Sequence, residues 1–248
     1  MDISDFFRAH PSSALAFSGG VDSAYLLWAA KRAGADVLAC YVKTPFQPQF
    51  ELDDARRIAA ELGVKLIICE ADPLAVPEIA SNPPDRCYFC KRLIFGTVRD
   101  AAAAAGFDLL LDGTNASDDA SDRPGMRALR ELGVRSPLRE CGLTKDEIRC
   151  RSREAGLFTW DKPAYACLAT RIPAGEAVTA EKLRKTEAAE DYLFSLGFRD
   201  FRVRMTGNNA KLQLREADFP RLLVRKAEIL AALRQFYDCV TLDLEARP

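Results

Sequence analysis

Residues 18–23 (SGGVDS) are the part of this 248-residue sequence whose types point most directly to chemistry. They stand between an apolar run and a helical pattern. Glycines let backbone amides approach a ligand closely, and the N-terminus of a helix favours negative charge. Serine hydroxyls add donors, and Asp22 can help to hold the Mg²⁺ that neutralises a phosphate chain. The stretch therefore predicts a site for a polyphosphate.

The sequence has no G-x-x-x-x-G-K-[ST] motif, so this loop differs from the phosphate loop of kinases and GTPases. It resembles the PP-loop of ATP pyrophosphatases, which cleave ATP to AMP and pyrophosphate and adenylylate a substrate oxygen. The bland alternative is a glycine turn with an Asp or Ser cap. The resemblance implies that ATP is bound by Ser18, Gly19, Gly20, Val21, Asp22 and Ser23, with Asp22 catalytic.

A second polar stretch, DGTNASDDASDRPG at 112–125, follows another apolar run. Its composition alone also fits a solvated surface loop. Ligands of parallel α/β sheets bind where the carboxyl ends of the strands emerge, so we expect this stretch to form a wall of the ATP site. Gly113 and Asn115 would then lie near the nucleotide, and Asp118 near Mg²⁺.

Three cysteines form the third candidate group. Cys87 and Cys90 make a C-x-x-C motif after a loop signal, Asn-Pro-Pro-Asp, and Cys167 stands in a proline-flanked loop. A lone C-x-x-C fits a redox pair, half of a zinc site or two ligands of an iron–sulfur cluster. A structural zinc site needs four ligands, whereas a [4Fe-4S] cluster tolerates three. Three unligated thiols remain an alternative.

The other cysteines make poor fourth ligands by their predicted positions. Two lie in predicted core strands, two in or near a helix and one in the last predicted strand: Cys40, Cys69, Cys141, Cys150 and Cys239. The sequence has one histidine, His10, which argues against a multi-histidine metal site or a Cys-His nucleophile pair.

The composition limits the classes of binding partner that we expect. Lys and Arg number 35 and Asp and Glu 36, a net charge of -1, so no global basic field attracts nucleic acid or an anionic membrane. No apolar run approaches the roughly 20 residues of a membrane span, and the first residues lack the layout of a signal peptide. We therefore expect a cytoplasmic protein without a nucleic-acid or membrane partner. In that compartment its eight cysteines are suited to thiol or metal chemistry more than to disulfides.

Strands and helices that alternate along the chain must position these groups. Apolar runs of strand length occupy 13–18, 35–42, 64–70 and 107–114, and helical patterns occupy 23–34, 51–63 and 91–106. This alternation predicts the α/β class, with a parallel, doubly wound sheet of the PP-loop ATP pyrophosphatase type. Both polar loops then emerge at the carboxyl ends of strands.

The pattern changes near residue 174. A helix is predicted at 179–197, a hairpin at 198–215, a helix at 218–236 and a last strand at 239–245. We predict two domains, a PP-loop domain with the cysteine loops at 1–173 and a small α+β domain for substrate binding or oligomerisation at 174–248.

Several longer motifs occur together in one order: SGGVDS, NPPDRCYFCKRLIF, DGTNASDDASDRPGMRAL, LTKDEIR, WDKPAYACLATRIP and FRVRM. In this the chain resembles the LarE family of PP-loop sulfur transferases over nearly its whole length. That family makes the pincer cofactor of nickel-dependent lactate racemase and related enzymes. The resemblance implies a homo-oligomeric, ATP-dependent sulfurtransferase that adenylylates the carboxylates of pyridinium-3,5-biscarboxylic acid mononucleotide and converts them to thiocarboxylates.

The family has two ways to supply sulfur. In one, a single cysteine at the position of Cys167 surrenders its own sulfur and becomes dehydroalanine. In the other, three cysteines hold a [4Fe-4S] cluster whose free iron carries an extra sulfide. Because this chain has Cys87, Cys90 and Cys167, the resemblance implies the cluster form, with these residues as metal ligands and catalytic residues.

The mononucleotide carries a phosphate and carboxylates, and arginine is well suited to bind such anions. Arg202 and Arg204 share one face of a predicted strand, and they match the anion-binding arginines of the family. Arg171 and Glu190 are further substrate-binding candidates by position. The alternative for the strand is a solvated sheet face.

Three other functions compete with this one. A tRNA thiolase of the PP-loop class is expected to carry basic surfaces or added RNA-binding modules. An amide-forming ligase needs an ammonia source and has no use for the three cysteines. A nucleotide-sensing module binds ATP without release of pyrophosphate.

Overall fold

The computed structural model describes residues 2–118 and 124–247, so part of the second polar stretch lies outside the described residues. The chain forms two compact units. One comprises Met1–Pro73 and Asp85–Lys162, and the other Leu74–Pro84 and Pro163–Pro248. Two segments that the sequence analysis assigned to the first domain, 74–84 and 163–173, therefore pack with the C-terminal part of the chain.

Backbone hydrogen bonds explain why the segment 74–84 belongs to the second unit. Gly175 N donates to the carbonyl of Asn82 at 2.8 Å, and Val178 N donates to the carbonyl of Ala80 at 2.8 Å. The Asn82 side chain, 1% exposed, adds a hydrogen bond of 2.7 Å to the carbonyl of Pro173. Because these bonds join residues about ninety positions apart, no local sequence pattern announces them.

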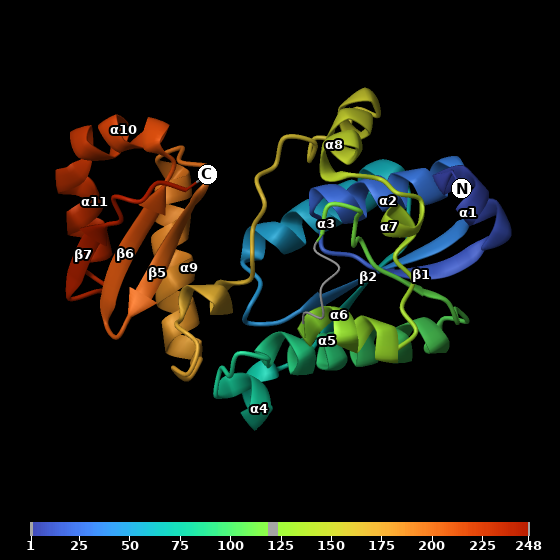
Figure 1. The fold of residues 1–248 in the computed structure, drawn as a ribbon, viewed down its shortest axis with the longest axis horizontal. Coiled ribbons are helices and arrows are strands. Elements are labelled where there is room, and N and C mark those ends of the chain that lie inside the picture. Colours follow the sequence, from blue (N-terminus) through green and yellow to red (C-terminus); the bar gives the residue numbers. More distant parts are fainter. Residues whose placement is uncertain (1, 119–123, 248) are drawn as a thin grey trace. The chain divides into compact units, whose positions relative to one another are not determined.

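A four-stranded parallel sheet forms the centre of the first unit, as predicted (Figure 1). Its strands are β3 (Leu66–Glu70), β2 (Asp36–Lys43), β1 (Ser12–Ala16) and β4 (Leu110–Leu111), in that spatial order. The last strand is much shorter than the predicted one, because the chain leaves the ladder after Leu111, where it bridges Arg135.

Helices cover both faces of this sheet, which makes it doubly wound (Figure 1). Alternate strand residues face opposite sides, so Leu15 and Ala39 pack into one core and Ala14 and Leu38 into another. On the second face Val98 of α5 completes the core. The helices of this unit are α1 (Ile3–Ala9), α2 (Val21–Arg32), α3 (Gln49–Leu62), α5 (Arg86–Ala104), α6 (Pro124–Glu131), α7 (Pro137–Glu140) and α8 (Lys145–Glu154).

Helix α5 begins five residues before the predicted start at 91. The loop signal Asn-Pro-Pro-Asp is real, but it ends at Asp85, which is the N-cap of the helix. Cys87 and Cys90 therefore lie on the first turns of a helix and not on a loop. At a spacing of three residues their side chains share one face of that helix.

The second unit contains an antiparallel hairpin, β5 (Phe201–Thr206) and β6 (Asn209–Leu214), extended by the parallel strand β7 (Cys239–Leu242). The predicted helix at 218–236 is interrupted at Arg225 and forms α10 and α11. The other elements are η1 (Pro73–Ala75), α4 (Pro77–Ala80), η2 (Leu168–Arg171), α9 (Ala180–Ser195), η3 (Glu216–Asp218), α10 (Phe219–Val224) and α11 (Lys226–Leu233). Among the described residues, no helix combines the length and apolarity that a membrane crossing requires.

Gly19 fixes the turn from β1 into α2. Its φ is +70°, a conformation that favours glycine, and a Cβ built there would lie 2.8 Å from Ala55 N and 3.0 Å from the carbonyl oxygen of Glu51. The turn therefore rests directly on the backbone of α3, with no room for a side chain.

We predict that Gly19→Ala destabilises the first unit more than a matched glycine change does. Gly34 has a φ of +76° but nothing within 4 Å of its built Cβ, so Gly34→Ala isolates the backbone cost, about 1–2 kcal/mol. Gly19→Ala adds a steric clash, which should lower the free energy of unfolding by a further amount of about 1–3 kcal/mol, the usual cost of overpacking. Urea unfolding measures both variants. Equal losses for the two variants would contradict the steric account.

Candidate active site

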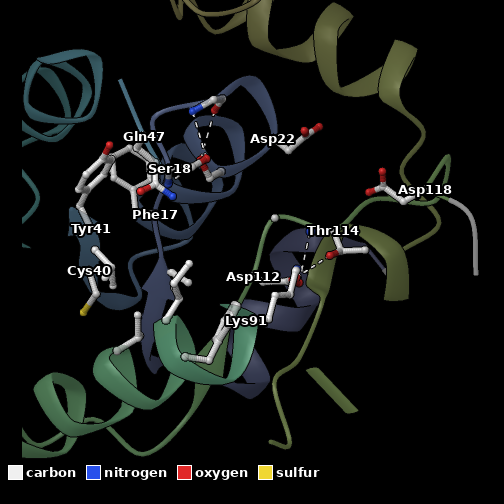
Figure 2. A pocket seen from close by; sticks show the side chains of 18 of the residues that line it. Phe17, Ser18, Asp22, Cys40, Tyr41, Gln47, Lys91, Asp112, Thr114 and Asp118 are labelled. Atoms are coloured by element: carbon white, nitrogen blue, oxygen red, sulfur yellow. Dashed lines mark hydrogen bonds between the residues drawn. The ribbon is translucent and has the colours of Figure 1, made fainter. Parts of the chain in front are cut away.

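A topological switch point locates the first part of the site. The chain passes from β1 to β2 on one side of β1, whereas β4 lies on the other side, so the loops after β1 and β4 separate at their carboxyl ends. A cavity of about 460 Å³ lies there, lined by residues from both loops and from α5 (Figure 2).

The loop after β1 presents hydrogen-bond donors to this cavity. Ser18 Oγ lies 3.1 Å from Ser23 Oγ and accepts a hydrogen bond from Gly20 N at 3.3 Å. Gly20 occupies the N-cap position of α2 but has no side chain that could accept a hydrogen bond from the first amides. In α8 and α9 the side chains of Thr144 and Thr179 accept such a bond. The first amides of α2 are therefore not satisfied by a capping side chain, and they form an anion-binding end of the helix.

The loop after β4 packs against the first turn of α2. A Cβ built on Gly113 would lie 3.1 Å from Ser23 N, a contact tighter than most real Cβ atoms make, so glycine suits this close approach. Asn115 Nδ2 donates to Asp22 Oδ1 at 3.2 Å, and Asn115 N donates to Asp118 Oδ2 at 2.8 Å. The structure thus brings Gly113, Asn115 and Asp118 together with the loop at 18–23.

Three aspartates, Asp22, Asp112 and Asp118, line the cavity (Figure 2). Asp112 already accepts hydrogen bonds from Thr114 and Ser136, which leaves Asp22 and Asp118 as the candidate metal ligands. Mg²⁺ that is bound with a nucleotide uses one or two carboxylates together with phosphate oxygens and water. This donor set fits that requirement. Within residues 2–118 and 124–247, no three His, Cys, Asp or Glu side chains are grouped so that they could hold a metal ion by themselves.

The other end of the cavity is mostly apolar. Phe17, Tyr41 and Val42 line it together with Gln47, and Figure 2 shows Phe17, Tyr41 and Gln47 close to one another, away from Asp22 and Asp118. An aromatic and aliphatic wall with one amide suits a planar base, while the loop at 18–23 suits phosphates. The apolar end of the cavity therefore matches the base of a nucleoside polyphosphate, and the polar end matches its phosphates.

The three candidate thiols are divided between the units. Cys87, exposed, and Cys90, half-buried, lie on α5, and Cys167, half-buried, is the N-cap of η2 in the second unit. All eight cysteines are in the described part of the chain, and none forms a disulfide. Iron–sulfur clusters are held by cysteine thiolates, which reduced thiols such as these can supply.

Burial distinguishes the remaining cysteines. Cys40 lines the cavity, but burial and the neighbouring Cys69 raise its pKa to about 12, so it stays a thiol and is a poor nucleophile. Cys150 and Cys239 are exposed, so burial does not exclude them as ligands.

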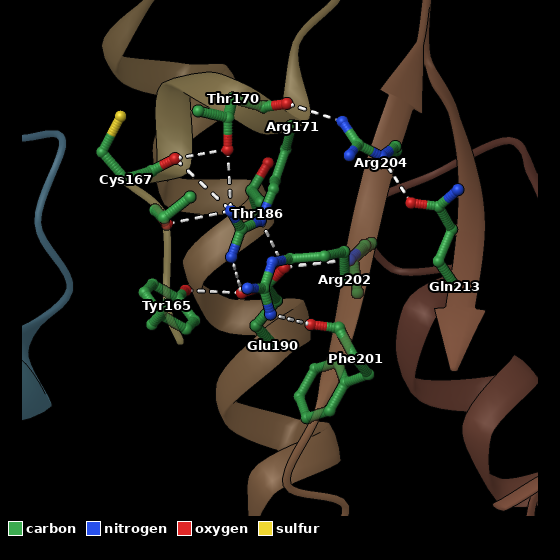
Figure 3. Close-up of polar contacts among 12 residues, drawn as sticks. Tyr165, Cys167, Thr170, Arg171, Thr186, Glu190, Phe201, Arg202, Arg204 and Gln213 are labelled. Atoms are coloured by element: carbon green, nitrogen blue, oxygen red, sulfur yellow. Dashed lines mark hydrogen bonds and ion pairs between the residues drawn. The ribbon is translucent and has the colours of Figure 1, made fainter. Parts of the chain in front are cut away.

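A buried ion pair organises the second unit around Cys167 (Figure 3). Arg171 and Glu190 are each 1% exposed, and Arg171 donates to both carboxylate oxygens, at 2.8 and 2.9 Å. Arg171 also donates to the carbonyl of Ala166 and to Thr170 Oγ1, while Glu190 accepts from Val203 N at 2.9 Å. Burial lowers the pKa of Arg171, but the hydrogen bonds and charge of Glu190 outweigh it and the net shift is upward.

Arg202 and Arg204 lie on one face of β5, as predicted. Arg202 is 6% exposed and donates to the carbonyl of Phe201 at 2.6 Å, so the alternative of a solvated sheet face does not describe it. Burial first, then the charges of Arg171 and Arg247, lower the pKa of Arg202 to about 10. The same causes lower the pKa of Arg204, which donates to the carbonyl of Thr170 at 2.9 Å. The guanidinium groups of Arg171 and Arg247 thus repel those of Arg202 and Arg204, and a bound anion would relieve that repulsion.

Comparison with known proteins decides the family. A family model described as queuosine biosynthesis protein QueC matches residues 13–80. An uncharacterized protein of Synechocystis sp. is 36% identical over 98% of this chain and 92% of its own length. The pyridinium-3,5-bisthiocarboxylic acid mononucleotide synthase of Lactiplantibacillus plantarum is 35% identical over 93% of this chain and 84% of its own length. The chain belongs to the LarE family of this synthase.

Membership of the LarE family confirms the resemblance that the motifs indicated, and with it the PP-loop fold. The protein is an ATP-dependent sulfurtransferase. A more distant relative, the tRNA-specific 2-thiouridylase MnmA of Streptomyces coelicolor, is 29% identical over 63% of this chain and 53% of its own length.

Sequence reasoning did not single out several residues that contact the site. Lys145 lies 2.6 Å from Asp22, and Tyr165 donates to Glu190. Gln213 accepts a hydrogen bond from Arg204. Lys145 and Tyr165 stand in the quoted motifs LTKDEIR and WDKPAYACLATRIP, and Gln213 lies nine positions after Arg204 in the predicted hairpin, so each residue had a usable signal although its pairing did not.

We predict that Glu190→Ala lowers the free energy of unfolding of the second unit by about 3–5 kcal/mol, because it leaves the Arg171 guanidinium buried and unpaired. The control is Glu181→Ala on the same helix, which removes an exposed partner of Lys185 and should cost at most about 1 kcal/mol. Urea unfolding monitored by circular dichroism measures both. Similar losses for the two variants would contradict the organising role of the buried pair.

Proposed function

We propose that this enzyme adenylylates the carboxylates of pyridinium-3,5-biscarboxylic acid mononucleotide and converts them to thiocarboxylates. One observation carries the proposal: a cavity with an uncapped helix end and three aspartates, in a chain related over most of its length to a pyridinium-3,5-bisthiocarboxylic acid mononucleotide synthase. A free carboxylate is a poor acceptor for sulfur, and ATP cleavage can activate it.

The first half-reaction forms an acyl adenylate. A carboxylate oxygen of the substrate attacks the α-phosphorus of ATP, and pyrophosphate leaves. The amides at the start of α2 and the hydroxyls of Ser18 and Ser23 stabilise the negative charge of the phosphate chain. Asp22 and Asp118 would hold Mg²⁺, which neutralises part of that charge. The donors that bind pyrophosphate thus also stabilise it as a leaving group.

The second half-reaction replaces AMP by sulfur. We propose that Cys87, Cys90 and Cys167 hold a [4Fe-4S] cluster, a group that supplies an iron site able to carry exchangeable sulfide. Three reduced thiols that are at least partly exposed support this assignment. A sulfur nucleophile then attacks the acyl carbon, and AMP leaves with one oxygen of the original carboxylate.

Arg202 and Arg204 are proposed to bind the phosphate or the carboxylates of the substrate, because they lie together on one face of β5 and are repelled by Arg171 and Arg247. The buried Arg171 and Glu190 were also substrate-binding candidates. Their mutual hydrogen bonds support a different role, in which they hold the backbone of the Cys167 turn in place for the reaction. We further propose the homo-oligomeric assembly of the family, which sedimentation analysis tests.

The thiolase alternative predicts a different acceptor. The chain spans about half the length of the tRNA-specific thiouridylases it matches, and its net charge of -1 gives no global attraction to RNA. The small pyridinium nucleotide is therefore the acceptor that we propose.

We predict that pyrophosphate forms only when ATP and the pyridinium biscarboxylate mononucleotide are both present. Asp22→Asn should lower this rate by about 100-fold or more, because charge stabilisation in the phosphate site is lost. Asp36→Asn, an exposed change at the start of β2, is the control and should have the wild-type rate. Pyrophosphate release with tRNA alone, or formation of ADP, would contradict the proposal.

We predict about four irons and at least as many acid-labile sulfides per chain after anaerobic reconstitution. Cys87→Ser, Cys90→Ser and Cys167→Ser should each lose most of this iron, whereas the exposed Cys150→Ser and Cys239→Ser should keep it. Colorimetric iron and sulfide assays measure both quantities. Absence of iron in the wild type, with dehydroalanine at position 167 after turnover, would instead show the sacrificial form.

A further inference from the structure

An ion pair stands at the edge of the phosphate site. Lys145 Nζ lies 2.6 Å from Asp22 Oδ2, and Asn115 Nδ2 lies 3.2 Å from Asp22 Oδ1. The two charged side chains are 28% and 24% exposed. Both oxygens of a cavity-lining carboxylate are therefore already occupied by nitrogen donors.

The backbone of Lys145 is held firmly. It is the first residue of α8, whose N-cap Thr144 forms a capping box with Glu147. Lys145 N donates to Ser117 Oγ at 2.9 Å, in the same loop that carries Asn115. Lys145 thus joins the start of α8 to the wall of the cavity, which distinguishes it from an ordinary surface lysine.

In this position Lys145 competes with a metal ion for the carboxylate of Asp22. Mg²⁺ takes oxygen ligands at about 2.0–2.1 Å and demands near-octahedral geometry, so it competes for Asp22 Oδ2 with an ammonium group already at hydrogen-bond distance. Two cations on one carboxylate also repel each other. A phosphate chain, however, offers the displaced ammonium new oxygen partners.

We propose that Lys145 is a built-in counter-ion of Asp22 in the nucleotide-free enzyme, and that it transfers to the phosphate chain when Mg²⁺ and ATP bind together. The inference rests on the proposed ATP site with Asp22 as a metal ligand. Lys145 thereby makes metal binding dependent on nucleotide and becomes a phosphate-binding residue itself. The free enzyme is left with little affinity for the divalent cation.

The test compares Lys145→Met with Lys182→Met, which removes a half-buried lysine paired with Glu176 in the second unit. Mn²⁺ binding to the nucleotide-free enzyme is measured by the electron paramagnetic resonance of free Mn²⁺, and ATP binding by calorimetry in the presence of Mg²⁺. Lys145→Met should bind Mn²⁺ about tenfold more tightly, and should bind ATP about 10- to 100-fold more weakly, the worth of one charge-assisted hydrogen bond. Lys182→Met should change neither.

An unchanged Mn²⁺ affinity, or an unchanged ATP affinity, overturns the proposal. The double variant Asp22→Asn with Lys145→Met should lose the gain in Mn²⁺ affinity, and retention of the gain also overturns it. A merely structural salt bridge would change stability without tighter binding of Mn²⁺. Neither measurement needs the pyridinium substrate, so failure of the proposed function would appear separately, as absence of thiocarboxylate product from the wild type.

Discussion

The contact between the Gly19 turn and the backbone of α3 is the constraint on which the proposed nucleotide site depends. The turn has no room for a side chain at Gly19, and the loop after β4 meets the same helix start through Gly113. Three backbone segments therefore fix where the uncapped amides of α2 point. Donors that are already oriented need no reorganisation when negative charge develops, which is the source of electrostatic catalysis.

The second unit obtains its rigidity in another way. A buried carboxylate and guanidinium are stable only when their hydrogen bonds are nearly all satisfied, and Arg171 and Glu190 meet that condition. Arg171 donates to the carbonyls on the N-terminal side of η2, and Arg204 donates to the carbonyl of Thr170. The turn that begins at Cys167 is thus joined directly to the strand that carries Arg202 and Arg204 (Figure 3). The Cys167 turn and the arginines proposed to bind substrate are positioned by the same contacts.

Much of the first unit follows from local pattern. Apolar runs, glycine signals and helical periodicity predicted the strands β1, β2 and β3 and the parallel, doubly wound class. The loops at 18–23 and 112–118 meet because parallel strands expose their carboxyl ends on one edge of a sheet. The start of α5 was misplaced, because two prolines before Asp85 suggested that the loop continued through the cysteines.

What the sequence could not reveal depends on contacts between distant residues. The segment 74–84 packs with the second unit through Asn82, and Lys145 pairs with Asp22 across more than a hundred positions. Nor does residue type distinguish a substrate-binding arginine from one that is buried in an ion pair. Arg204 was a substrate-binding candidate by its match to the family's arginines and Arg171 by its position, and only the structure shows that Arg171 is buried against Glu190 whereas Arg204 donates to the carbonyl of Thr170.

The central claim is that ATP activates a carboxylate of the pyridinium mononucleotide as its adenylate before sulfur replaces AMP. The most direct test uses substrate whose carboxylates carry oxygen-18, with mass spectrometry of the nucleotide product and of the thiocarboxylate. The account predicts that each sulfur installed transfers one oxygen-18 atom to AMP. Unlabelled AMP alongside thiocarboxylate product, or label found in inorganic phosphate, would contradict it.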